Sequence, residues 1–154
     1  MKRSIFDQQA LDEILTRVHL LTAGTRGKWG KPSTQQMTRH LSEAGRMAFD
    51  EVNVPDQSNV ITRTLVKWLF LRNIKPPGRE KGNIKTFPQV DIIALGIEVN
   101  SLDDELRSYE GVLRRIVATK NLSSRHPLFG RMSRDDWGYL TYAHADYHLT
   151  QFNV

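Results

Sequence analysis

Apolar residues recur at helical spacing along most of this chain, and no segment shows the sustained period-two alternation of a strand. A first apolar stripe lies between about residues 5 and 23 and comprises Leu11, Ile14, Leu15, Val18 and Leu21. Gly24 follows it and is a plausible end for the helix. A second stripe comprises Met37, His40, Leu41, Ala44, Met47, Ala48 and Val52. The period predicts helices that each bury one face.

Serine residues mark the expected starts of three helices. Ser33 has Gln36 three residues on, which is the spacing of a capping box. Ser101 and Ser133 are each followed by acidic residues, which suit the first turn of a helix because of the helix dipole. These acids are Asp103, Asp104 and Glu105 after Ser101, and Asp135 and Asp136 after Ser133.

The rest of the chain completes a helical pattern. Residues 59–73 predict a shorter helix, and residues 74–88, rich in Pro, Gly and Lys, predict a long irregular connection. After Ser101, apolar residues at spacings of four and three form the seam of a bundle helix: Leu102, Leu106, Tyr109, Leu113 and Ile116. We therefore expect an all-α fold, an antiparallel bundle in which residues 1–154 form one domain.

Composition narrows the classes of function. The chain has 154 residues and no cysteine, which excludes disulfides, thiolate catalysis and a cysteine-ligated zinc site. It has no apolar run of membrane-spanning length and no secretory signal, so a cytoplasmic protein is expected. The net charge of +5 is compatible with a protein that binds nucleic acid or an anionic small ligand. A nucleic-acid role is unfavoured because the aromatic residues do not interleave with a basic stripe.

Two histidines near the end of the sequence have the spacing of metal ligands. His144 and His148 are four residues apart, so they lie one above the other on a helix and can converge on one cation. The zincin pattern H-E-x-x-H has this spacing, but Ala145 stands in place of its glutamate, which excludes the metalloprotease interpretation. The alternative is a pair of unrelated polar side chains on a helix surface.

A third histidine favours the metal hypothesis. His40 belongs to the apolar stripe of its own helix, and His144 and His148 share a face with Trp137 and Thr141. Side chains that project inward from facing helices build the metal sites of helical bundles. Three neutral imidazoles leave a coordination position open for water or substrate. For His40 alone, the alternative is a core histidine that is hydrogen bonded to a backbone or carboxylate partner.

Two segments carry a resemblance to a known family. The first is "KWGKPSTQQMTRHLSEA", and the second is the C-terminal "HPLFGRMSRDDWGYLTYAHADYHLTQFNV". Together they resemble the DinB/YfiT-like superfamily. More narrowly, they are similar to a branch of uncharacterised bacterial proteins that carries the patterns W-G-K-x-x-x-x-Q-M-x-x-H and H-x-D-x-H-L-x-Q-F. The resemblance follows nearly the whole chain in order, and its specificity comes from these two segments.

The resemblance implies a four-helix bundle with up-down-down-up topology. It also implies a divalent metal ion, usually nickel or zinc, held by His40, His144 and His148. Many relatives have a histidine where this chain has Tyr147, a position outside the three ligands. Members of the wider superfamily include S-transferases and isomerases that use the thiols mycothiol or bacillithiol.

Two hypotheses about function follow. The first is a metal-dependent enzyme, a thiol-dependent transferase or a hydrolase, which acts on a small molecule and pairs as a homodimer. The second is a non-catalytic binding module whose metal is structural or vestigial. Three further residues are expected beside the metal: Gln151, which can orient His148, Trp137, which can wall the pocket, and His126, for which a loop-closing hydrogen bond is the alternative. Glu43 can reach the site as a base or lie on a solvated face, and Asp146 is expected to point away.

Overall fold

Four long helices form the body of the computed structural model, which describes residues 3–71 and 87–154. They are α1 (Gln8–His19), α2 (Thr34–Arg46), α4 (Leu102–Ala118) and α5 (Arg134–Gln151). Most of the described residues are helical, so the all-α prediction is confirmed at that level. None of the described helices is long and apolar enough to cross a membrane.

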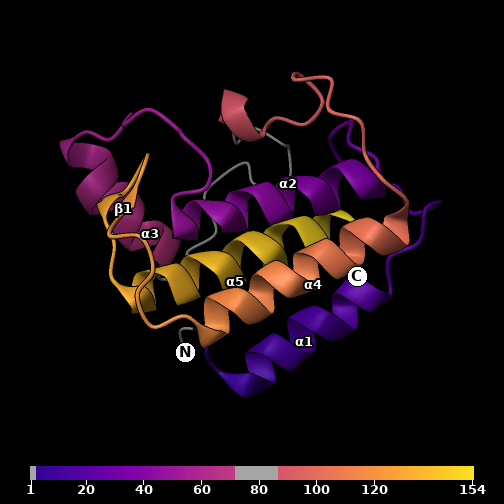
Figure 1. The fold of residues 1–154 in the computed structure, drawn as a ribbon, viewed down its shortest axis with the longest axis horizontal. Coiled ribbons are helices and arrows are strands. Elements are labelled where there is room, and N and C mark those ends of the chain that lie inside the picture. Colours follow the sequence, from indigo (N-terminus) through magenta and orange to yellow (C-terminus); the bar gives the residue numbers. More distant parts are fainter. Residues whose placement is uncertain (1–2, 72–86) are drawn as a thin grey trace.

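The four long helices run in two opposite directions. In Figure 1, α1 and α5 run one way, and α2 and α4 run the other way. The closely packed pairs are α2 with α4 and α1 with α5, so the members of each pair are parallel. Helical periodicity alone indicated an antiparallel bundle without such pairs, whereas the up-down-down-up order implied by the resemblance includes them. Parallel neighbours need a long connection, and residues 47–101 provide one between α2 and α4.

Short elements occupy the connections. They are η1 (Met47–Phe49), η2 (Thr62–Val66, π-helical), α3 (Lys67–Leu71), η4 (Pro88–Val90), β1 (Arg125–His126) and β2 (Gly130–Arg131). The helix expected within residues 59–73 is present as η2 and α3. The connection expected over residues 74–88 lies outside the described residues except for its last two. The β1–β2 hairpin, which the sequence did not predict, is antiparallel.

The predicted N-terminal ends of three helices are confirmed, and each is capped by a serine. Ser33 and Gln36 form the predicted capping box, and Ser133 forms a second one with Asp136. The Ser101 hydroxyl accepts a hydrogen bond from the backbone N–H of Asp104. These contacts satisfy N–H groups that have no partner within the helix, which is why the starts were predictable from single residues.

The first two helices are shorter than their apolar stripes. α1 begins at Gln8 because the Asp7 side chain accepts a hydrogen bond from the N–H of Gln9. Ile5 and Leu21 lie beyond the helix but are buried, so the stripe follows the core and not the helix. α2 ends at Arg46, and the chain leaves η1 through Asp50 with φ of 58°. The predicted extension to residue 52 was therefore wrong.

One apolar core joins the four helices. The core includes Ile14 and Val18 from α1 and Met37 and Leu41 from α2. The residues from α4 and α5 are Leu113, Ile116, Trp137, Tyr142, Ala145 and Leu149. Gly45 allows α2 and α4 to approach closely, because a Cβ atom there would lie 2.5 Å from Val112 Cγ1. α2 also contacts α5.

Candidate metal centre

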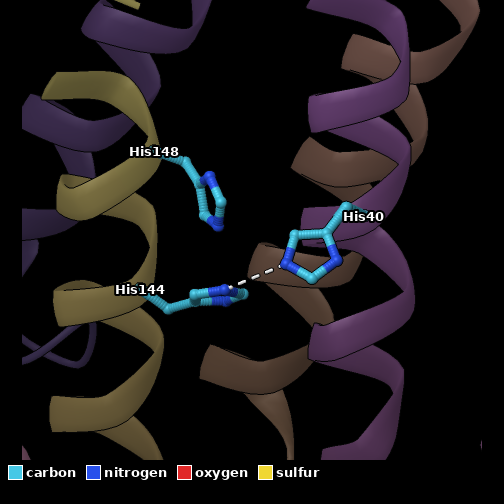
Figure 2. A group of neighbouring side chains, drawn as sticks. All are labelled: His40, His144 and His148. Atoms are coloured by element: carbon cyan, nitrogen blue, oxygen red, sulfur yellow. Dashed lines mark hydrogen bonds between the residues drawn. The ribbon is translucent and has the colours of Figure 1, made fainter. Parts of the chain in front are cut away.

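Three histidines from two helices point toward a common centre (Figure 2). His40 comes from α2, and His144 and His148 come from α5, one helical turn apart. One ring nitrogen from each lies within 4.8 Å of the others. The Nε2 atoms of His40 and His144 are 3.2 Å apart. Two imidazole nitrogens bound to one tetrahedral zinc ion lie ~3.3 Å apart, so this pair fits a shared ion with little movement.

The backbone of η4 fixes the ring of His40. The His40 Nδ1–H donates to the carbonyl oxygen of Val90 at 2.9 Å. The remaining nitrogen, Nε2, therefore carries its lone pair toward the centre. A hydrogen bond of this kind sets the tautomer and the orientation of metal-bound histidines. The backbone-partner alternative for His40 is thus also present, and it is compatible with metal binding.

Gln151 fixes the ring of His148 in the same way. Its Oε1 accepts from His148 Nδ1 at 2.9 Å, and its Nε2 donates to the carbonyl oxygen of Trp29 at 2.6 Å. The contact that the sequence suggested between Gln151 and His148 is present. The sequence did not reveal the contributions of Val90 and Trp29, although the W-G-K pattern that begins at Trp29 marked that segment.

Burial favours the neutral form of two of the three histidines, His40 and His144. It lowers the pKa of His40, an effect that the Val90 hydrogen bond and the charge of Asp91 oppose. Burial also lowers the pKa of His144 well below its usual value, and the neighbouring His148, His40 and His126 lower it further. Neutral imidazoles are the form that binds metal. Because His40 Nδ1 carries a hydrogen, the short contact between His40 and His144 makes His144 Nε2 the donor, and an ion would displace that hydrogen.

The three imidazoles are only partly buried. The described cluster offers three protein ligands, one fewer than a closed structural zinc site has, so one coordination position would stay open for water or substrate. Among the described residues, the metal-ligand cluster contains histidines alone.

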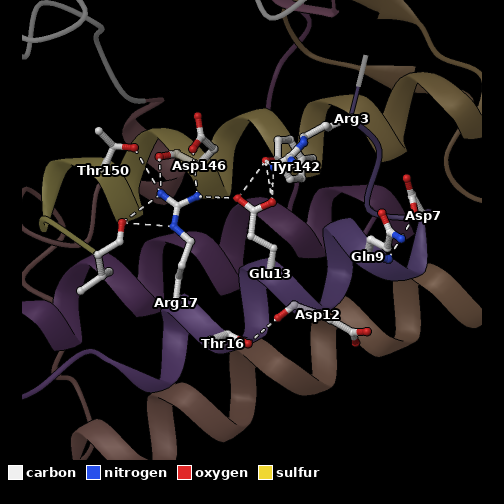
Figure 3. A network of polar contacts seen from close by, with 11 residues as sticks. Arg3, Asp7, Gln9, Asp12, Glu13, Thr16, Arg17, Tyr142, Asp146 and Thr150 are labelled. Atoms are coloured by element: carbon white, nitrogen blue, oxygen red, sulfur yellow. Dashed lines mark hydrogen bonds and ion pairs between the residues drawn. The ribbon is translucent and has the colours of Figure 1, made fainter. Parts of the chain in front are cut away.

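The two candidate carboxylates form ion pairs elsewhere. Glu43 pairs with Arg39 at 2.9 Å and with Arg46 at 2.8 Å. Asp146 projects toward α1 and pairs with Arg17 at 2.9 Å (Figure 3). The expectation that Asp146 points away is confirmed. Glu43 lies between two arginines of α2 and lines a hollow with residues of α4, so its carboxylate is held in these ion pairs.

His126 and Trp137 support the hairpin. His126 Nδ1 accepts the backbone N–H groups of Leu128 and Phe129 at 3.1 and 3.3 Å, which confirms the loop-closing hydrogen bond. Trp137 Nε1 donates to the Ser123 carbonyl oxygen at 2.7 Å. The two rings contact each other with centroids 5.6 Å apart. They therefore order the loop before α5.

Cationic side chains gather around a hollow at the other end of α5. Its lining includes Arg63, Lys67, Arg125 and Arg131. Asp56 pairs with Arg63 and Arg125, and Asp136 pairs with Lys67. The two carboxylates therefore offset two of these four positive charges.

One comparison with known proteins identifies a family. The model of the family described as "Protein of unknown function (DUF1569)" matches residues 1–154. No curated protein and no solved structure matches the chain. The match covers both histidine-bearing helices and the segments that orient their rings. By this match the chain belongs to the DUF1569 family.

Proposed function

We propose that this chain binds one divalent metal ion through the Nε2 atoms of His40, His144 and His148 and is a metal-dependent enzyme. The convergence of the three ring nitrogens within 4.8 Å carries the proposal. The hydrogen bonds from Nδ1 of His40 and His148 add support, because a hydrogen on Nδ1 places the lone pair of each ring on Nε2. Imidazole ligands suit zinc and nickel, the two ions that we expect.

The residues divide the work between binding and orientation. The three imidazoles supply neutral ligands, so the full charge of the ion would be retained. Val90 and Gln151 fix two of the rings with uncharged oxygen acceptors. When bound, the ion would act as a Lewis acid that lowers the pKa of a water or a thiol, or polarises a substrate oxygen. The substrate is a small molecule, and the reaction is a thiol-dependent transfer or a hydrolysis.

The proposal extends to the fold. We place the chain among four-helix bundles of the DinB/YfiT-like type with up-down-down-up topology. The directions of α1, α2, α4 and α5 in Figure 1 support this, as does the position of one histidine on α2 and two on α5. An experimental structure in which α2 and α4 ran in opposite directions would contradict it.

A second candidate is a non-catalytic module with a structural metal. The pairing of Glu43 and Asp146 with arginines favours it, because neither carboxylate is available as a general base. The partial exposure of the three imidazoles opposes it, since structural ions are enclosed by four protein ligands. Exchange of the bound ion by a mild chelator within minutes would favour the open site. Retention through overnight dialysis, without any small ligand bound, would favour the structural one.

Metal content tests the proposal. Protein stripped with a chelator and then reloaded with zinc or nickel should hold about one ion per chain by elemental mass spectrometry. His144→Ala and His148→Ala should each abolish stoichiometric loading. His19→Ala is the matched control, because His19 is exposed on α1 and pairs with Glu110. Equal loading of His144→Ala and the wild-type protein would reject the site.

A further inference from the structure

We infer that Trp29 and Gln151 form a positioning pair that holds the imidazole of His148 in its metal-binding orientation. The inference rests on the proposed function for its consequence, the metal affinity, but the positioning itself is a property of the metal-free chain. Trp29 lies in the connection between α1 and α2, and Gln151 is the last residue of α5. The pair therefore links a ligand to a loop that is distant in sequence.

The argument begins with the two faces of the Gln151 amide. Its NH₂ group donates to the Trp29 carbonyl oxygen at 2.6 Å, a partner that can only accept. This contact fixes which end of the amide faces His148, and that end must be the oxygen. The oxygen in turn accepts from His148 Nδ1 at 2.9 Å. The Trp29 carbonyl thus selects the Nδ1–H tautomer of His148 through one intermediate group.

Further contacts keep the pair in place. The backbone N–H of Lys28 donates to the Gln151 carbonyl oxygen at 2.7 Å, so the loop holds both the backbone and the side chain of Gln151. The Trp29 indole N–H donates to the hydroxyl of Tyr147 at 3.3 Å. The Tyr147 ring meets the His148 ring edge to face, with centroids 4.8 Å apart. Trp29 therefore reaches His148 by two routes.

Two glycines make this approach sterically feasible. Gly30 has φ of +83°, and a Cβ atom there would lie 2.8 Å from Gln151 Nε2. A Cβ atom on Gly27 would lie 3.0 Å from the Trp29 carbonyl oxygen and 3.4 Å from Gln151 Cγ. Any larger residue at position 30 would move the amide of Gln151 or the loop. Space and backbone conformation thus both explain the glycine before Lys31.

The expected consequence is a loss of metal affinity without loss of the ligand. Removal of a group that orients a metal-bound histidine costs ~10- to 100-fold in affinity. Gln151 is buried with 4% exposure, so bulk water has little access to the position of its side-chain oxygen. Without the amide, His148 would be free to carry its hydrogen on Nε2, and the ion would have to displace it.

The experiment measures the tautomer directly. Long-range ¹H–¹⁵N NMR spectra of the metal-free protein at pH 8 distinguish Nδ1–H from Nε2–H imidazole. His148 should be the Nδ1–H tautomer in wild-type protein and a mixture in Gln151→Leu. Gln151→Glu, which keeps an acceptor beside Nδ1, should retain the wild-type tautomer. Competition titrations with a chromogenic zinc chelator should show ~10- to 100-fold weaker binding for Gln151→Leu.

Glycine variants test the loop separately. Gly30→Ala should shift the tautomer and weaken zinc binding as Gln151→Leu does. Gly96→Ala is the matched control, because Gly96 also has a positive φ, +61°, but nothing lies within 4 Å of its added Cβ atom. It should keep both the wild-type tautomer and the wild-type affinity. An equal effect in the two glycine variants would overturn the role of the loop.

The outcomes separate this inference from the metal proposal. A wild-type tautomer in folded Gln151→Leu would overturn the inference, even if zinc binding were weaker. A shifted tautomer in that variant, in a chain whose wild-type form binds no metal, would uphold the positioning pair and reject the metal function. If Gln151→Leu does not fold, the comparison of Gly30→Ala with Gly96→Ala decides the question.

Discussion

Protonation of one buried histidine, His126, should contribute measurably to the loss of stability of this protein in acid. Burial and, to a smaller extent, the charge of Lys67 lower the pKa of His126 to about 4. Its Nδ1 accepts two backbone N–H groups, so a hydrogen on that atom would break both bonds. In the unfolded chain the same imidazole takes up its proton at the ordinary value near 6.5. Between these values the unfolded state binds more protons than the folded state, and stability falls as the pH falls.

The size of the effect follows from the two pKa values. For pKa values of 6.5 and about 4, a decrease from pH 7 to pH 5 removes ~2 kcal/mol from the free energy of unfolding. Above pH 7 the contribution is nearly constant, and below pH 4 it levels off. The free energy of unfolding of a small domain is about 5–15 kcal/mol, so a loss of this size is a substantial part of it.

Urea unfolding at pH 7 and pH 5, with a chelator present, measures this loss. His126→Asn is the informative variant, because the asparagine oxygen can replace Nδ1 as the acceptor and does not titrate. Other buried histidines also contribute, so the comparison is between the pH dependence of the variant and that of the wild-type protein. The variant should lose ~2 kcal/mol less between the two pH values. An identical pH dependence in both proteins would refute the reasoning.

Further predictions concern the packing of the helices. Gly45→Ala should lower the free energy of unfolding by ~1–3 kcal/mol, because its Cβ atom would lie 2.5 Å from Val112 Cγ1. Gly111→Ala, with nothing within 4 Å of its Cβ atom, should be neutral or stabilising, and equal losses in urea would contradict the close approach of α2 and α4. Trp137→Phe should cost ~1–3 kcal/mol because the buried Ser123 carbonyl oxygen loses its donor. Unchanged thermal unfolding would show that this bond is replaced.

The sequence predicted what neighbouring residues decide. The starts of α2, α4 and α5 depend on a serine and a residue three positions later, and each was predictable from the sequence. The ends of α1 and α2 depend on where the core lies, so the apolar stripes overestimated both helices. The parallel pairing of α2 with α4 depends on the course of a long connection, which local periodicity does not determine.

The candidate site divides in the same way. The spacing of His144 and His148 follows from one turn of helix, and Gln151 follows three residues later. The approach of His40 required facing helices, an expectation that the structure confirms at 3.2 Å from His144. The carbonyl groups of Val90 and Trp29 offered no signal, because every residue has one, and only the folded chain shows which of them meets an imidazole.

Sequence distance gives the three-histidine cluster one more property. His40 and His144 are 104 positions apart, so an ion bound to both would close a loop of most of the chain. In the loop-entropy account of cross-links, closing a loop of that length lowers the entropy of the unfolded chain and so raises the free energy of unfolding by ~4–5 kcal/mol. A chain without cysteine would thereby gain a cross-link that reducing agents do not break and that chelators reverse. Loading with metal would then slow the separation of α2 from α5 and protect the protein from proteolysis.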